Sequence, residues 1–121
     1  MTDPPVQDLG ARRLEYARAL DDAVARAVAI LGRKPAVHLV VVFGSYATGR
    51  RDLFTDLDLM VVMESGESFV DRTASLYREL AAGVDLDLLV YTPEEFERLK
   101  TRGLVRRILQ TGRVILEKRP A

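Results

Sequence analysis

Residues 37–63 have the sequence VHLVVVFGSYATGRRDLFTDLDLMVVM. A β-branched apolar run fills 37–43 and is too short for a typical helix, which predicts a strand buried on both faces. Gly44 ends that run, and a polar loop follows it. Residues 56–63 alternate between acidic and apolar positions and then become continuously apolar, which predicts a second strand. The stretch therefore predicts two strands joined by a loop with room for one or two helical turns.

Helices are predicted on both sides of this stretch. Before it, apolar residues recur at helical spacing over 9–31, and Gly32 is well placed to end that helix. After it, helical spacing returns over 68–82, with Gly83 as the expected C-cap. Each helix would therefore present one apolar face to the strands.

The C-terminal third adds shorter elements. Residues 84–91 predict a third strand, and Thr92 and Glu95 flank a proline in the pattern of a capping box that starts a helix ending near residue 100. A further helix and an edge strand are predicted at 104–110 and 114–116. The order of elements predicts an α/β fold, with a small mixed sheet covered by helices mainly on one face.

The composition limits the classes of protein that fit. The 121 residues have room for a single domain, over 9–118, after a flexible lead-in at 1–8. Eighteen basic and 18 acidic residues cancel, so we expect no nucleic-acid partner. Cysteine is absent, so a metal would be bound by carboxylates. Without a signal peptide or an apolar stretch of about 18 residues, we expect a cytoplasmic protein with no membrane partner.

Two Asp-x-Asp pairs lie on the predicted strands. Asp56 and Asp58 begin the second strand, and because strand side chains alternate, both carboxylates should project from one face. Asp85 and Asp87 repeat the pattern on the third strand. If these strands are neighbours, Asp56, Asp58 and one member of the later pair converge on two metal ions, which supports in-line phosphoryl displacement. An isolated pair of this kind is more often a solvated strand entry.

The turn Gly44-Ser45 is a candidate phosphate site. Glycine lets the backbone approach a ligand, and exposed amides at a following helix start bind phosphate. Ser45 adds a hydroxyl to the same place. Arg50 and Arg51 border the turn, and either contact with a triphosphate or plain solvation fits their position.

The sequence GSYATG, followed by six residues and then DLDL, resembles the signature of the DNA polymerase β-like nucleotidyltransferase superfamily, and of its minimal nucleotidyltransferases in particular. The matching positions are Gly44, Ser45, Ala47, Gly49, Thr55, Asp56, Asp58 and Leu59, with Thr55 where serine is commoner. In that family a third aspartate precedes an apolar run and a Thr-Pro-Glu-Glu helix start. Asp87 matches it, whereas Asp85 lies two residues too far from Thr92 and stays in reserve. The resemblance spans about residues 37–116.

The resemblance implies a polymerase β-like nucleotidyltransferase fold and a Mg²⁺-dependent activity. A nucleoside monophosphate would pass from a nucleoside triphosphate, with ATP favoured, to an acceptor hydroxyl, and pyrophosphate would leave. The implied catalytic residues, which also bind two Mg²⁺ ions, are Asp56, Asp58 and Asp87. The implied nucleotide-binding residues are Gly44, Ser45 and Thr55.

The resemblance also implies a protein partner. Minimal nucleotidyltransferases act beside a helical HEPN-type protein, as antitoxin and toxin, and transfer AMP to a tyrosine of that partner. Two alternatives stay open: a transferase for a small, aminoglycoside-like acceptor, and a non-catalytic antitoxin module that only binds its partner. The long first helix is also compatible with a homodimer.

Overall fold

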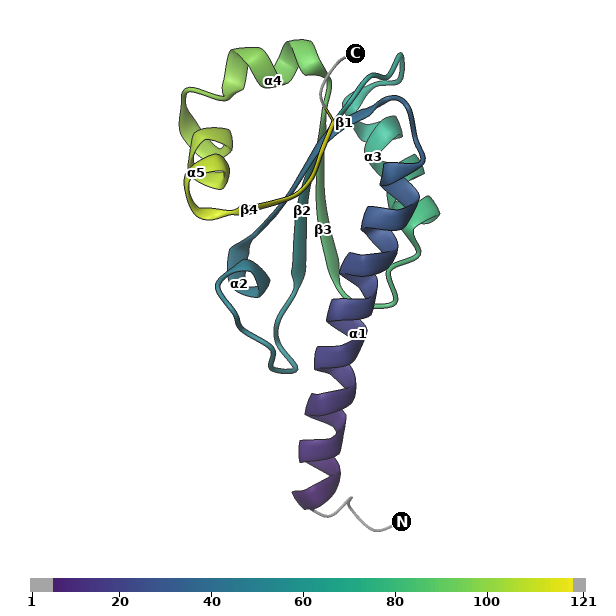
Figure 1. Ribbon diagram of the computed structural model, residues 1–121, viewed down its shortest axis with the longest axis vertical. Coiled ribbons are helices and arrows are strands. Elements are labelled where there is room, and N and C mark those ends of the chain that lie inside the picture. The colour runs from purple at the N-terminus through teal and green to yellow at the C-terminus, as the bar shows by residue number, and fades with distance from the viewer. Residues whose placement is uncertain (1–5, 119–121) are drawn as a thin grey trace.

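A four-stranded mixed sheet forms the centre of the computed structural model, which describes residues 6–118 (Figure 1). The strand order is β3-β2-β1-β4; β1 is antiparallel to β2 and to β4, and β3 is parallel to β2. The predicted mixed sheet is therefore confirmed. The strand bounds are β1 Val37–Phe43, β2 Leu57–Met63, β3 Leu86–Tyr91 and β4 Arg113–Glu117.

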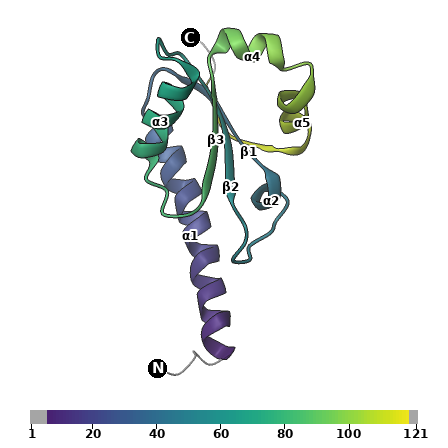
Figure 2. The same cartoon turned by 180° about the vertical axis from the view of Figure 1, so that it is seen from behind.

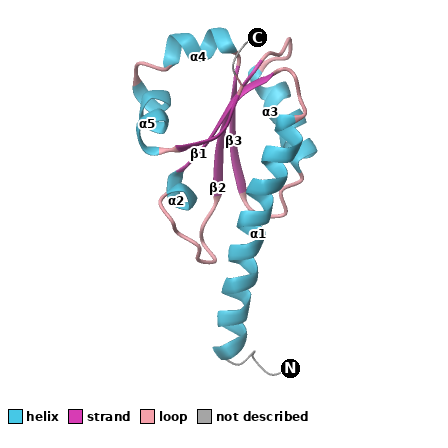
Figure 3. Ribbon diagram, in the orientation of Figure 1, coloured by secondary structure: helices cyan, strands magenta, loops and turns pink. Residues whose placement is uncertain are grey.

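Five helices surround the sheet in the described part of the chain. The two long ones, α1 and α3, cover one face, while α4 and α5 cover one end of the other face (Figures 1 and 2). The rest of that second face, beside α2, is left uncovered by helices (Figure 3). The helix bounds are α1 Val6–Gly32, α2 Gly44–Ala47, α3 Phe69–Leu80, α4 Pro93–Leu99 and α5 Gly103–Thr111.

Alternation along the strands divides the core into two clusters. Leu57, Leu59 and Val61 of β2 face α1 and α3, whereas Met60 faces α5 together with Val41 of β1. These side chains are almost fully buried, and each contributes roughly 1.5–3 kcal/mol to folding. On the face that α4 and α5 cover only in part, the uncovered residues of β2 can carry polar side chains.

Some element boundaries differ from the sequence-based expectation. Helix α1 begins at Val6 and not at residue 9, so residues 6–8 of the expected lead-in are helical, and residues 1–5 lie outside the described residues. Strands β2 and β3 begin at Leu57 and Leu86, which places Asp56 and Asp85 immediately before them. Among residues 6–118, no helix has the length and apolar content needed to cross a membrane.

Helix ends show one confirmed prediction and one error. The capping box of α4 is present, with the Thr92 side chain accepting from the Glu95 amide and the Glu95 side chain accepting from the Thr92 amide. The predicted C-cap of α3 at Gly83 is wrong, because Ala81 takes the left-handed conformation with φ 41°. The buried Arg72 donates to Glu95 and so ties α3 to the start of α4.

Candidate active site

Asp58 and Asp87 lie side by side on the uncovered part of the sheet. They are direct partners in the parallel pairing of β2 with β3, and Asp58 is paired on its other side with Phe43 of β1. Asp58 is two residues from Met60, so both carboxylates face away from α1 and α3. The two strands thus bring together the two aspartates that the strand pattern suggested.

The environment of Asp58 is strongly negative. Burial raises the pKa of its carboxyl group from the ordinary 3.8 to about 6, helped by a hydrogen bond with Asp87 and by the charges of Asp87 and Asp56. A hydrogen bond between two carboxyl groups requires that they share a proton. Among residues 6–118, the groups that shift this pKa include no cationic side chain.

The donor set fits Mg²⁺ in its chemistry. Carboxylate oxygens are the ligands that this ion prefers, and a cation would offset both the burial and the repulsion that raise the pKa of Asp58. Within residues 6–118, however, no three acidic, histidine or cysteine side chains form a ready-made metal cage. The structure therefore provides the pair Asp58 and Asp87, with Asp56 near enough to act on Asp58 through its charge. Magnesium ions that keep several waters and bind substrate phosphates need no larger protein cage.

Asp85 has a different position from Asp87. It is exposed and precedes β3, and its backbone carbonyl accepts a hydrogen bond of 2.9 Å from the amide of Leu57. Asp87, not Asp85, is the strand partner of Asp58. The geometry therefore favours Asp87 as the third carboxylate.

The turn at Gly44 is in direct contact with the carboxylate pair. Gly44 has φ +72°, and a Cβ atom added there would lie 2.0 Å from Oδ2 of Asp58. Only glycine leaves room for that carboxylate and adopts this conformation without strain. Ser45 follows at the partly exposed start of α2, whose N-cap residue offers no side-chain hydrogen bond. The candidate phosphate turn and the carboxylates thus form one continuous surface.

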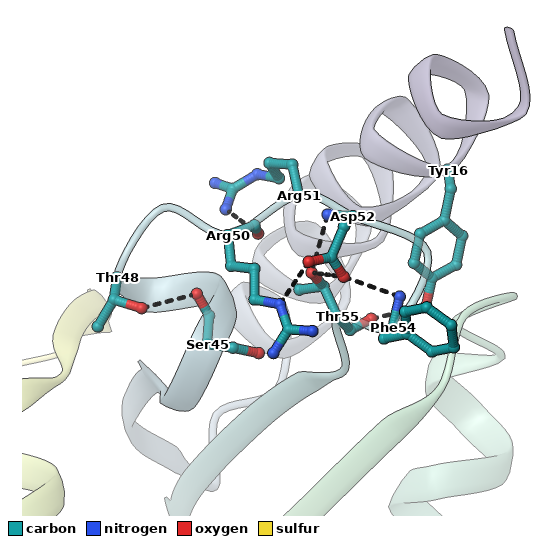
Figure 4. Close-up of polar contacts among 8 residues, drawn as sticks. All are labelled: Tyr16, Ser45, Thr48, Arg50, Arg51, Asp52, Phe54 and Thr55. Atoms are coloured by element: carbon teal, nitrogen blue, oxygen red, sulfur yellow. Dashed lines mark hydrogen bonds and ion pairs between the residues drawn. The ribbon is translucent and has the colours of Figure 1, made fainter. Parts of the chain in front are cut away.

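A tight turn precedes β2 and holds Thr55 in place (Figure 4). The amide of Asp52 donates to Oγ1 of Thr55 at 3.0 Å, and this hydroxyl donates to the Asp52 carboxylate at 3.2 Å. Thr55 is fully buried, so its hydroxyl stabilises the turn that leads to Asp56. Direct contact of Thr55 with a nucleotide stays a prediction.

The two adjacent arginines of this loop have different environments. Arg51 lies 3.5 Å over the ring of Tyr46 and donates to the backbone carbonyls of Tyr46 and Arg50 at 2.8 Å each. Arg50 is exposed, forms an ion pair with Asp52 at 2.6 Å and extends on the side of the loop where Ser45 lies (Figure 4). Arg51 therefore supports the loop, whereas Arg50 is paired with Asp52 and exposed on the side of the Gly-Ser turn.

Replacing these arginines separately should give two distinct results. If Arg50 contacts the triphosphate, Arg50→Ala is expected to raise the KM for the nucleoside triphosphate about tenfold with little change in kcat, because one charge beside the phosphates is lost. Arg51→Ala is expected to lower the free energy of unfolding by roughly 1–2 kcal/mol, because the stacking contact and two hydrogen bonds are lost. Steady-state kinetics and urea unfolding of both variants measure this split, and identical kinetics for Arg50→Ala and wild type would contradict the assignment.

Helix α1 positions both halves of the site, which sequence reasoning did not foresee. Tyr16 donates a hydrogen bond of 2.8 Å to the carbonyl of Thr55, just before Asp56. Tyr46 of α2 donates one of 2.5 Å to the carboxylate of Asp21. Burial raises the pKa of each tyrosine, so both hydroxyls stay protonated as donors. One helix therefore fixes the Gly-Ser turn relative to the aspartate strand.

Comparison with known proteins identifies the family of this chain. Residues 26–121 match the family model described as "Polymerase beta, Nucleotidyltransferase". Because the match covers most of the chain and includes the Gly-Ser turn and all the candidate carboxylates, the protein belongs to the polymerase β nucleotidyltransferase family. It is therefore a nucleotidyltransferase, in agreement with the resemblance of the signature around Gly44 and Asp58.

Two solved structures have a similar fold. A "putative nucleotidyltransferase" from Sulfolobus solfataricus is 17% identical, with a TM-score of 0.54 over 98% of this chain and 93% of that chain. A chain of a mutant form of the toxin-antitoxin MntA-HpeT is 18% identical, with a TM-score of 0.50 over 82% of this chain and 73% of that chain. No curated protein gives a significant match.

Proposed function

We propose that this protein is a Mg²⁺-dependent transferase that moves AMP from ATP to a hydroxyl group of a partner protein. The observation that carries the proposal is the contact between the Gly44 turn and the Asp58–Asp87 pair, which sets a phosphate-binding backbone beside carboxylates of unbalanced charge. A nucleoside triphosphate would bring negative phosphates to the Gly-Ser turn, and a divalent cation would bring positive charge to the carboxylates.

Each candidate residue has a defined role in the proposed reaction. Asp56, Asp58 and Asp87 would hold Mg²⁺, which would lower the charge on the triphosphate and the pKa of the acceptor hydroxyl. Gly44 and Ser45 orient the β- and γ-phosphates. The acceptor oxygen attacks the α-phosphorus, its proton passes to Asp87, and the bond from the α-phosphorus to the bridging oxygen breaks. Pyrophosphate leaves with that electron pair.

The proposed role is that of an antitoxin whose acceptor is a tyrosine of a helical HEPN-type toxin. Support comes from the resemblance to minimal nucleotidyltransferases and from the fold similarity to a chain of the MntA-HpeT toxin-antitoxin pair.

Transfer of label from α-labelled ATP to proteins of the host lysate tests this function, with GTP, CTP and UTP in parallel. We expect Mg²⁺-dependent label on a discrete protein, with ATP as the best donor, and no label with the Asp56→Ala/Asp58→Ala variant. Label on a small molecule would instead establish the aminoglycoside-like alternative. Partner binding without label from any nucleotide would establish the non-catalytic module.

A further inference from the structure

A run of positive charge covers the segment from α4 to β4. Residues 98–116 contain no aspartate or glutamate, although the whole chain has 18 acidic and 18 basic residues. The rest of the chain is therefore net acidic. The basic residues of the segment are Arg98, Lys100, Arg102, Arg106, Arg107 and Arg113.

The arginines at the start of α5 and along it have no acidic partner within residues 6–118. Arg102, Arg106 and Arg107 are exposed, and none of them takes part in an ion pair between described residues. By contrast, Arg50 and Arg72 are both paired with carboxylates. Three unpaired charges of one sign at one short helix produce a local positive potential that attracts an anionic partner.

Helix α5 stands beside the candidate active site. Val105 and Ile108 pack on Val41 and Met60, on the face of the sheet that carries Asp58 (Figures 1 and 2). Met60 is two residues from Asp58, or about 7 Å along the strand. With the width of a helix added, the arginines on its outer side lie roughly 15–20 Å from the carboxylates. An extended polypeptide of about five residues spans that distance.

The outer side of α5 also carries a shallow, open depression. A hollow of about 540 Å³ is lined by Gly103, Leu104, Arg106, Arg107 and Gln110. Leu104 is 54% exposed there, so apolar and cationic groups alternate on one surface. A polypeptide with acidic and apolar side chains complements this mixture.

A nucleic acid fits the same surface less well. Its phosphates would pair with the arginines, but a strand with a charge at every nucleotide has no apolar side chain to pack on exposed Leu104. A polypeptide can place its acidic residues on the arginines and a neutral tyrosine at the carboxylates.

We propose that the outer face of α5, through Arg106 and Arg107, binds an acidic segment of the acceptor protein and presents a hydroxyl about five residues away to the active site. The proposal rests on the proposed function in one respect, that the acceptor is a protein. The surface would then set which tyrosines of a partner are modified.

A binding measurement that needs no catalysis tests the surface. Three fluorescein-labelled probes are compared. Two are peptides with one tyrosine and, five residues away, a cluster of either four glutamates or four lysines. The third is a single-stranded RNA of similar length. By fluorescence anisotropy we expect the glutamate peptide alone to bind, with salt-sensitive affinity, and Arg106→Glu/Arg107→Glu to weaken it at least tenfold. The matched control Arg33→Glu/Arg78→Glu makes the same change of net charge at exposed arginines on the other side of the sheet and should bind like wild type.

Each outcome separates the surface from the catalytic function. Binding of the glutamate peptide by Asp58→Asn, with transfer lost, is the expected pattern. If wild type binds the peptide through the arginines but transfers no label to any acceptor, the proposed function fails and the surface stands. Equal weakening by both charge-reversal variants, or preference for the RNA, would overturn the proposal for α5 even if a partner protein is labelled.

Discussion

Asp58→Asn is expected to lower the rate of nucleotidyl transfer by at least about 1,000-fold, because the amide keeps the shape of the side chain but removes a charge that balances the cation. Asp87→Asn should have a similar effect, since Asp87 is the direct strand partner of Asp58. The matched control is Asp85→Asn, which changes an exposed carboxylate that precedes β3. Asp85→Asn should keep transfer within about threefold of wild type, since a surface charge outside the site adds little to transition-state binding.

The same Asp58→Asn variant should be more stable than wild type in the absence of Mg²⁺. The pKa of Asp58 is raised to about 6 by burial and by Asp87 and Asp56, so ionising it costs the folded state more than the unfolded state. That penalty is complete above about pH 6 and disappears below the unfolded pKa near 4. With solvent screening allowed for, Asp58→Asn should gain roughly 1–2 kcal/mol at pH 8 and nothing at pH 3.5.

Urea unfolding at several pH values, with and without Mg²⁺, checks the stability difference alongside the transfer assay. Added Mg²⁺ should stabilise wild type and leave Asp58→Asn unchanged, because only wild type has the full carboxylate set. If Asp85→Asn loses as much transfer as Asp87→Asn, or if the stability of Asp58→Asn follows that of wild type at every pH, the assignment of the carboxylate pair is wrong.

Much of the fold was predictable because the local patterns agree with the tertiary structure. The apolar run at 37–43 forms β1 with the expected bounds, and the Thr92–Glu95 capping box starts α4. The order of strands in the sheet was not predictable, since no local pattern encodes which strands pair. The error at the end of α3 has a local cause: glycine is only the usual left-handed residue, and Ala81 takes that conformation one residue after Leu80.

The residues of the candidate site could be proposed from the sequence, but the side chains of α1 that hold them in place could not. Gly44, Asp58 and Asp87 carry the motif, and strand pairing brings Asp58 next to Asp87. The position of Tyr16 was a weak indication of such a role, because a tyrosine on the apolar stripe of a helix needs a hydrogen-bond partner for its hydroxyl. Asp21 gave none, since an exposed acid on a helix looks like any other solvated residue until Tyr46 is placed beside it.

Gly44→Ala is the second substitution for which we expect a large effect, on stability and on transfer together. The new Cβ atom would lie 2.0 Å from Oδ2 of Asp58, and φ +72° is itself unfavourable for alanine. We expect a loss of roughly 2–4 kcal/mol in the free energy of unfolding. Transfer should fall about 100-fold in the folded fraction, because Asp58 has to move from its position beside Asp87.

Gly49→Ala separates backbone strain from the clash. Gly49 also has a positive φ, of +100°, but nothing lies within 4 Å of a Cβ atom added there. This variant should lose only roughly 1–2 kcal/mol from strain and should keep its transfer activity. The difference between the two alanine variants then measures the contact with Asp58.

The double variant Gly44→Ala/Asp58→Ala completes the test. Removal of the carboxylate takes away the atom that the new Cβ meets, so stability should recover by about 1–2 kcal/mol relative to the sum of the single changes. Transfer should stay absent, because Asp58 itself is lost. If the two substitutions add without such recovery, the turn and the carboxylate are not in contact in solution. Recovery of stability would instead show that glycine is needed at position 44 because the turn lies directly against the carboxylate of Asp58.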